Sequence, residues 1–371
     1  MNWRNIGRLA LVGTLGSPLL SLVGCEVPRA NAPLLDTTTT MVEFIRPNIV
    51  AQASQMRGPL LFDTASDFSE GVAMVRLQNR IGYIDRNGSL TINVLDDNVI
   101  VAGEYVDGLA LARVGDYYGY LDRQGDWAID VQFRQAKSFS EGLAAVQGGT
   151  KYGFVNRDGE WMIEPQFDLA ESFSGGLATV KEGGSYGYID ANGSRVIPSN
   201  LRDAWSFSES LAVAKLNEKY GYLRPDGTVA IPAAYDGAFS FSGGLARVRQ
   251  GPSFGYINPK GEMIVEATLA FASDFSEGRA AVLMDGQWGY IDQQGEVAIA
   301  PQFDYAADFS EGLAAVQKDG RYGYIDTAGN WVVEPTYTNA GRFSEGFARV
   351  QMENQWGFIN EAGDLMTGNV F

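Results

Sequence analysis

The chain has 371 residues, of which 45% are hydrophobic and 20% charged, and this composition excludes a disordered protein. Its 45 acidic and 28 basic residues give a net charge of −17, which repels nucleic acid. There is no histidine and one cysteine, so an internal disulfide, a thiolate metal cluster and histidine-based catalytic or zinc sites are excluded. The 45 glycines and 12% aromatic residues favour strands and turns.

Residues 1–24 have the form of an export signal. Arg4 and Arg8 precede an apolar stretch that is too short, and too often interrupted by glycine and proline, to span a membrane comfortably. The stretch ends in Leu22-Val23-Gly24-Cys25, which resembles the lipobox of bacterial lipoprotein signal peptides. The resemblance implies cleavage before Cys25, acylation of its thiol and new amine, and a stable lipid anchor in the cell envelope.

An alternative to this interpretation is an ordinary secretory signal, cut after Ala30-Asn31-Ala32. If the host is Gram-negative, Glu26 departs from the usual inner-membrane retention signal, and the resemblance then implies the outer membrane. Removal of residues 1–24 leaves 26 basic and 45 acidic residues, a net charge of −19. Residues 25–58 have no regular period and are expected to form a tether between the anchor and the folded part.

A repeat dominates the remaining sequence, residues 59–371. A glycine that follows an aromatic residue recurs every 34 residues, and a ninth copy at Gly82 lies 37 residues before the first of these. The regular positions are Gly119, Gly153, Gly187, Gly221, Gly255, Gly289, Gly323 and Gly357. The sequence therefore predicts nine copies of one unit of about 34 residues.

Eight of the nine copies contain a four-residue segment with Asp or Asn first, proline tolerated second and glycine fourth, as in Asn258-Pro259-Lys260-Gly261, and the remaining copy has Arg224 first. This is the signature of a type I turn, in which the first side chain caps the turn. The carboxylates that fill the first position are therefore expected to be turn caps and not catalytic groups or metal ligands. They are Asp85, Asp122, Asp190, Asp292 and Asp326.

Strand signals flank each turn. Ala144 and Val146 recur as a pair in later copies and share one face of a strand. Four residues after the turn glycine, eight copies have Ile or Val, which we expect in the core, and the ninth has Thr367. Glycine inside a strand normally weakens it, so the repeated Gly predicts close approach of a neighbouring strand or ring.

These patterns predict an all-β fold made of tandem antiparallel meanders, with three short strands and a longer connection in each copy. The units must stack on one another, either in a propeller-like ring or in an open β-solenoid or superhelix. The segment 59–65 matches the late part of a copy, and the last copy lacks that part. A ring closed by the N-terminal segment would explain this, and we favour the ring.

The aromatic-Gly-aromatic-Ile-Asp core, with Phe-Ser-Glu-Gly-Leu-Ala upstream, resembles the bacterial WG-repeat family over residues 59–371. The Trp-Gly pairs are Trp288-Gly289 and Trp356-Gly357, and most other copies have Tyr-Gly. The resemblance implies a repeat fold, no catalytic residues and no cofactor. Departures from the pattern are Ser210 in place of Gly, Ile81 in place of an aromatic residue and Tyr105-Val106-Asp107-Gly108 in place of Phe-Ser-Glu-Gly.

The aromatic residue before each repeated glycine is the candidate ligand-binding position, and we call this set the aromatic ladder. Its members are Tyr118, Tyr152, Tyr186, Tyr220, Phe254, Trp288, Tyr322 and Trp356. Aromatic faces suit sugar rings and acidic rims suit basic proteins, so the expected partner is an envelope protein or a glycan. Stacking between copies is the structural alternative for these rings.

We expect a non-catalytic binding module without metal or other cofactor. A glycosidase-like hydrolase is one alternative, because paired carboxylates can act without histidine. A permanent structural or assembly component is the other. Against an enzyme, a grafted active site should interrupt the repeat at one copy, and the sequence shows no acid, lysine or serine outside the pattern with a plausible partner.

Overall fold

The computed structural model describes residues 58–94 and 98–368, and these form antiparallel sheets without a helix. The chain divides into two units, Met1–Gln52 and Ala53–Phe371, and every described residue belongs to the second. The expected signal peptide, Cys25 and nearly all of the tether at 25–58 lie outside the described residues. In the described part, no helix is long and apolar enough to cross a membrane.

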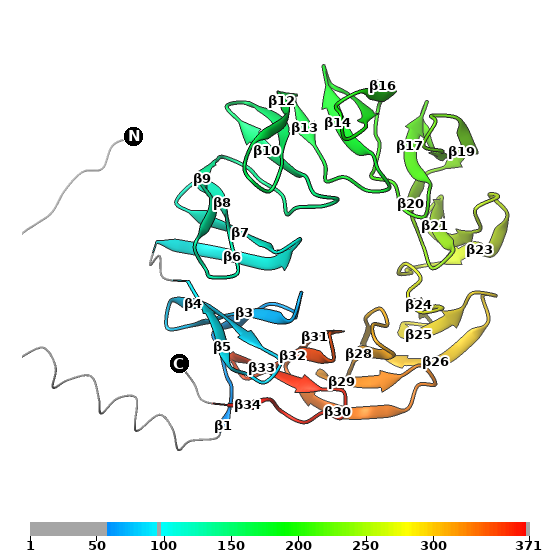
Figure 1. Ribbon diagram of the computed structural model, residues 1–371. Helices are drawn as coiled ribbons and strands as arrows, with labels where there is room; N and C mark the ends of the chain where they lie inside the picture. Colours follow the sequence, from blue (N-terminus) through cyan, green and yellow to red (C-terminus); the bar gives the residue numbers. More distant parts are fainter. Residues whose placement is uncertain (1–57, 95–97, 369–371) are drawn as a thin grey trace, which may run out of the picture. The chain divides into compact units, whose positions relative to one another are not determined.

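The second unit is a nine-bladed β-propeller, in which each copy of the repeat builds one sheet (Figure 1). In each blade the second, third and fourth strands pair in chain order. The second strands are β3 (Val72–Leu77), β7 (Leu109–Val114), β10 (Ala144–Gly148), β14 (Ala178–Glu182), β17 (Ala212–Leu216), β21 (Leu245–Gln250), β24 (Arg279–Met284), β28 (Leu313–Lys318) and β32 (Phe347–Met352). The third strands are β4 (Arg80–Asp85), β8 (Tyr117–Leu121), β11 (Lys151–Val155), β15 (Ser185–Ile189), β18 (Lys219–Leu223), β22 (Ser253–Ile257), β25 (Gln287–Asp292), β29 (Arg321–Asp326) and β33 (Gln355–Asn360). The fourth strands of blades 1–8 are β5 (Leu90–Asn93), β9 (Trp127–Phe133), β12 (Trp161–Phe167), β16 (Arg195–Leu201), β19 (Val229–Tyr235), β23 (Met263–Leu269), β26 (Val297–Phe303) and β30 (Trp331–Tyr337).

In six blades a first strand lies toward the middle of the ring, so the expectation of three strands per copy was wrong for these blades. The first strands are β2 (Thr64–Ala65), β6 (Val99–Val106), β13 (Leu169–Ala170), β20 (Gly237–Ser242), β27 (Tyr305–Ala306) and β31 (Asn339–Ser344). In blades 3, 5 and 7 single bridges replace this strand: Ala136 to Val146, Ala204 to Ala214 and Ala272 to Val282. The segment that we interpreted as a long connection therefore also pairs with the sheet. Often only one or two residues of this segment pair with the sheet. The segment therefore lacks the alternating apolar and polar pattern of a strand.

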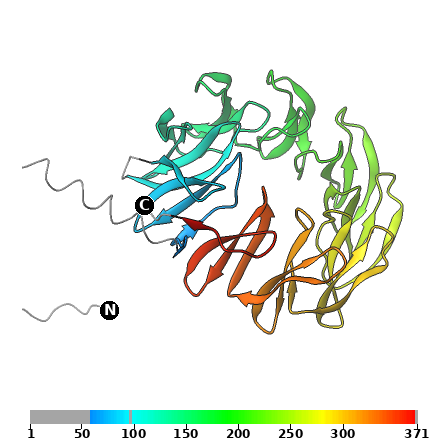
Figure 2. The ribbon, with the colours of Figure 1, turned by 60° about the horizontal axis from the view of Figure 1, so that its bottom comes forward.

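The N-terminal segment closes the ring by completing blade 9, as its match to the late part of a copy suggested. Phe62 and Trp356 exchange two backbone hydrogen bonds of 2.8 Å, and the amide of Leu60 donates to the carbonyl of Met366 at 3.1 Å. Just before this, β1 (Gly58–Pro59) pairs with β34 (Thr367–Gly368). Figure 2 shows the blue first blade beside the red ninth. The open superhelix is therefore excluded.

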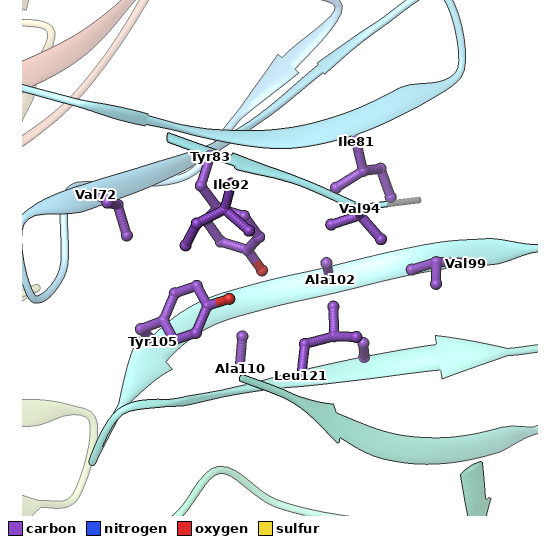
Figure 3. Packing of buried hydrophobic residues seen from close by; sticks show 11 residues of the cluster. Val72, Ile81, Tyr83, Ile92, Val94, Val99, Ala102, Tyr105, Ala110 and Leu121 are labelled. Carbon is purple, nitrogen blue, oxygen red and sulfur yellow. The ribbon is translucent and has the colours of Figure 1, made fainter. Parts of the chain in front are cut away.

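The core consists of apolar layers between neighbouring blades. In each layer the aromatic residue after the repeated glycine packs edge-on or tilted against an aromatic ring of the next blade, with ring centres 4.8–5.1 Å apart. Figure 3 shows one such layer, with Tyr83 of blade 1 against Tyr105 of blade 2. Burial raises the pKa of these tyrosines, which therefore stay neutral. The aromatic residue after the repeated glycine therefore packs between copies.

The Phe-Ser-Glu-Gly segment links each blade to the next. The serine hydroxyl donates to a main-chain carbonyl of the following blade in eight places, and Ser344 does so across the closure, to Phe68 at 2.8 Å. Val106 has no hydroxyl for the corresponding link. The glutamates accept amide hydrogens from the next turn, as Glu277 does from Glu311 and Gly312 at 2.8 Å. These acids therefore help to link neighbouring blades.

The turn and glycine predictions are confirmed. The five predicted aspartates each accept two amide hydrogens inside their turn, as Asp122 does from Gln124 and Asp126. Each turn glycine has a positive φ, between 77° and 89°. A Cβ on the strand glycine Gly153 would lie 2.4 Å from the carbonyl oxygen of Ile163, because the fourth strand approaches closely. The predicted Ile and Val positions are buried or half-buried, and Thr367 is exposed.

Candidate binding face

The eight residues of the aromatic ladder begin the third strands, directly after the hairpin turn. All eight side chains are half-buried. Cations lie over five of the rings: Arg113 over Tyr118, Lys181 over Tyr186, Lys215 over Tyr220, Arg247 over Phe254 and Arg349 over Trp356. The ladder position of blade 1 is Ile81, which is buried. The ladder thus forms a series of half-open rings, repeated from blade 2 to blade 9.

Three cavities lie beside ladder residues. A cavity of about 490 Å³ contains Tyr118, and one of about 370 Å³ contains Tyr186. The largest, about 570 Å³, contains Trp288 and extends along the inner segments of blades 7 and 8. We call this 570 Å³ space the inner cavity.

The inner cavity combines aromatic rings with charged groups of both signs. Its walls include Trp288 and Tyr305, whose ring centres are 6.1 Å apart, and the carboxylates Asp274 and Asp308. Arg247 donates from Nε to Asp274 at 3.1 Å and from a terminal nitrogen to the carbonyl of Ala272. These contacts fix the guanidinium between blades 6 and 7.

The surroundings of Asp274 shift the pKa of its carboxyl group. Burial raises the pKa of Asp274, the Arg247 cation opposes this, and the Asp308 charge raises the pKa further. Tyr305 is 44% exposed, so the cavity is accessible from solvent. Among the described residues, no cluster of three or more acidic or cysteine side chains has the arrangement of a metal site.

A second row of aromatic side chains accompanies the ladder in blades 5, 6 and 8. Trp205 stacks on Tyr220 with ring centres 5.8 Å apart and an angle of 13°, and it also contacts Phe239 of the next blade at 6.2 Å. Phe239 in turn contacts Phe254 at 6.1 Å. Tyr305 joins Trp288 to Tyr322. The rings of this row lie on or beside the innermost strands.

The repeated unit of this chain matches a known family model. The family model described as "WG containing repeat" matches residues 59–80, 118–149, 152–186, 186–220, 220–251, 254–288, 288–322 and 322–356. The chain belongs to the WG-repeat family. No curated protein matches it.

This WG-repeat protein is also similar to solved structures. One, described as the crystal structure of the eukaryotic initiation factor, is 10% identical, with 75% of this chain and 88% of that chain covered and a TM-score of 0.56. The C-terminal WD40 domain of Sif2 is 11% identical, with 82% and 98% covered and a TM-score of 0.44. BamB from Moraxella catarrhalis is 11% identical, with 81% and 93% covered and a TM-score of 0.38.

The sequence interpretation, which found no acid, lysine or serine outside the pattern with a plausible partner, missed the charged residues of the inner cavity. Arg247 occupies a position that is Ala281 in the next copy, and its partner Asp274 replaces a serine such as Ser240. Asp308 replaces the same serine in blade 8. These substitutions become visible when the copies are aligned position by position. The pairing itself joins neighbouring copies and needs the structure.

Proposed function

We propose that this WG-repeat protein is a non-catalytic glycan-binding module of the cell envelope, and that the inner cavity is its primary site. The observation that carries the proposal is the position of Trp288 and Tyr305 in one cavity with the carboxylates Asp274 and Asp308 and the cation Arg247. A propeller with repeated loops is also a common scaffold for binding.

The chemistry of the cavity suits a sugar. The CH face of a pyranose packs on an aromatic ring, and its hydroxyl groups donate to carboxylates and accept from a guanidinium. Trp288 and Tyr305 supply the rings, Asp308 supplies an acceptor, and Arg247 is held in place by Asp274. Because the binding groups are fixed by neighbouring blades, little ordering entropy is lost when a ligand binds.

A hydrolase is the second candidate, and one observation favours it. A glycosidase needs one protonated and one ionised carboxyl group, and burial raises the pKa of Asp274 while Asp308 lies in the same cavity. The contact from Arg247 favours the ionised form of Asp274 and so works against a general-acid role. Asp308→Asn separates the candidates: loss of reducing-end release from a bound glycan would support hydrolysis.

We also propose export and lipid anchoring through Cys25, because the only cysteine follows a signal-like segment in a lipobox. The net charge does not favour nucleic acid as a partner. A palmitate analogue should label the expressed full chain and not Cys25→Ala. If Cys25→Ala is still labelled and sediments with membranes, the lipobox interpretation is wrong.

The experiment for the binding site is co-sedimentation of the full chain with insoluble polysaccharides: chitin, cellulose and purified peptidoglycan. Trp288→Ala and Tyr305→Ala should each reduce the bound fraction, whereas the control Tyr117→Ala, an exposed ring outside the inner cavity, should not. Unchanged binding of both cavity variants would contradict the site. Retention of an envelope protein with no retention on any glycan would replace the glycan by a protein partner.

A further inference from the structure

The second row of aromatic side chains lies in blades 5, 6 and 8, and together with the ladder residues of blades 5–8 it forms one surface. We call this surface the aromatic arc; its members are Tyr220, Trp205, Phe239, Phe254, Trp288, Tyr305 and Tyr322. Ring contacts connect its first four members across blades 5 and 6, and its last three across blades 7 and 8.

Arg247 joins the two halves of the arc. Its guanidinium carbon lies 3.8 Å from the ring centre of Phe239 and 5.5 Å from that of Phe254, and the same side chain lines the inner cavity beside Trp288. At the other end, Trp205 lines the 370 Å³ cavity that also contains Tyr186. The arc thus runs from one cavity to another.

The arc has the form expected for a linear ligand. Its rings follow one another over four blades, and Trp205 and Tyr305 are 37% and 44% exposed. Polar groups border the rings at intervals: the hydroxyl of Tyr220 donates to Asp203 at 3.1 Å, and Arg247 pairs with Asp274. A sugar chain presents the matching alternation of CH faces and hydroxyl groups.

Charge determines which kind of sugar chain the arc can bind. Lys215 and Arg247 on the arc and Arg342 in the inner cavity are accompanied by Asp203, Asp274 and Asp308, so the local charge is balanced. The chain as a whole is strongly acidic and repels a polyanion. We propose that the aromatic arc is an extended site for a linear, uncharged polysaccharide, with several consecutive sugars on blades 5–8. This inference rests on the proposed glycan-binding function and adds the length and charge of the ligand.

Calorimetric titration of the full chain with chito-oligosaccharides and cello-oligosaccharides, from disaccharide to hexasaccharide, tests the arc. In the wild type, the affinity for at least one series should rise with chain length. Trp205→Ala should weaken hexasaccharide binding about tenfold, equivalent to ~1.4 kcal/mol, and leave disaccharide binding in the inner cavity unchanged. Trp205→Phe keeps an aromatic face and should restore most of the loss.

The control is Met162→Ala, an exposed side chain on the fourth strand of blade 3 outside the ladder and the arc, and it should bind every oligosaccharide as the wild type does. Affinity that is independent of length, but lost in Trp288→Ala, would overturn the arc and leave the proposed function intact. An equal loss in Met162→Ala and Trp205→Ala would also overturn the arc. No binding of any oligosaccharide by the folded chain would overturn both.

Discussion

Ring closure by the N-terminal segment depends most directly on Phe62. Its side chain is 1% exposed, packs against Phe358 with ring centres 6.4 Å apart, and belongs to a cluster that joins blade 9 to blade 1. Truncation of a buried phenylalanine to alanine costs about 3–5 kcal/mol of the free energy of unfolding. We therefore expect Phe62→Ala to lose ~4 kcal/mol, a large fraction of the 5–15 kcal/mol of a typical domain.

The control for Phe62→Ala is Phe303→Ala. Phe303 is also 1% exposed and occupies the corresponding place in the fourth strand of blade 7, where it packs against Trp331 at 5.8 Å. Both variants should lose similar stability in urea unfolding. Only Phe62→Ala should weaken the closure, because its strand enters blade 9 from the opposite end of the sequence.

Hydrogen exchange measured by mass spectrometry distinguishes the two variants. Phe62→Ala should increase exchange in β33 and β34, whereas Phe303→Ala should increase it in β25 and β26. If Phe62→Ala loses less than ~1 kcal/mol and β33 keeps its protection, the N-terminal segment does not close the ring and this reasoning is refuted.

Three further variants test the repeat. Val106→Ser should supply the missing hydroxyl link to the carbonyl of Phe139 and raise the free energy of unfolding by ~1 kcal/mol in urea titration; destabilisation would refute the link. Gly221→Ala, whose Cβ would lie 2.5 Å from a main-chain oxygen of the fourth strand, should lose about 1–3 kcal/mol, whereas Gly58→Ala in open space should change stability little; equal effects would contradict the close approach. The pKa of Asp326 is held below its ordinary value by hydrogen bonds from a neighbouring asparagine side chain and from backbone amides, so its stabilisation is present at neutral pH and is lost as pH falls below the ordinary aspartate pKa of about 3.9. Asp326→Asn should therefore be less stable than wild type at neutral pH, with a smaller difference in acid, and a difference independent of pH would contradict this.

Much of the fold could be predicted because each turn carries its own chemistry. Asp122 caps its turn and Gly125 takes the positive φ, and both are determined by residues four positions apart at most. The strand glycines could also be interpreted, because a glycine inside a strand indicates the close approach of a neighbouring group. Closure of the ring was favoured because the segment near Phe62 resembles the missing end of the last copy.

The features that the sequence did not predict depend on contacts between copies. The bond from Ser140 to the carbonyl of Phe173 joins two blades, so neither copy alone indicates it. The ion pair of Arg247 with Asp274 likewise crosses a blade boundary. The ladder could be identified as a repeated position, but the second row could not, because Trp205 and Tyr305 stand at different places in their copies. Their proximity to the ladder is a property of the folded ring.

The central claim is that a glycan binds on the aromatic arc and in the inner cavity. Hydroxyl-radical footprinting of the full chain, with and without the polysaccharide that it retains, tests the claim most directly. We predict protection of Trp205, Phe239, Trp288 and Tyr305, and none of Met162, which is exposed on a fourth strand at the circumference. Protection of Met162 with unchanged oxidation of Trp205 and Trp288 would contradict the claim and place the ligand on the outer strands.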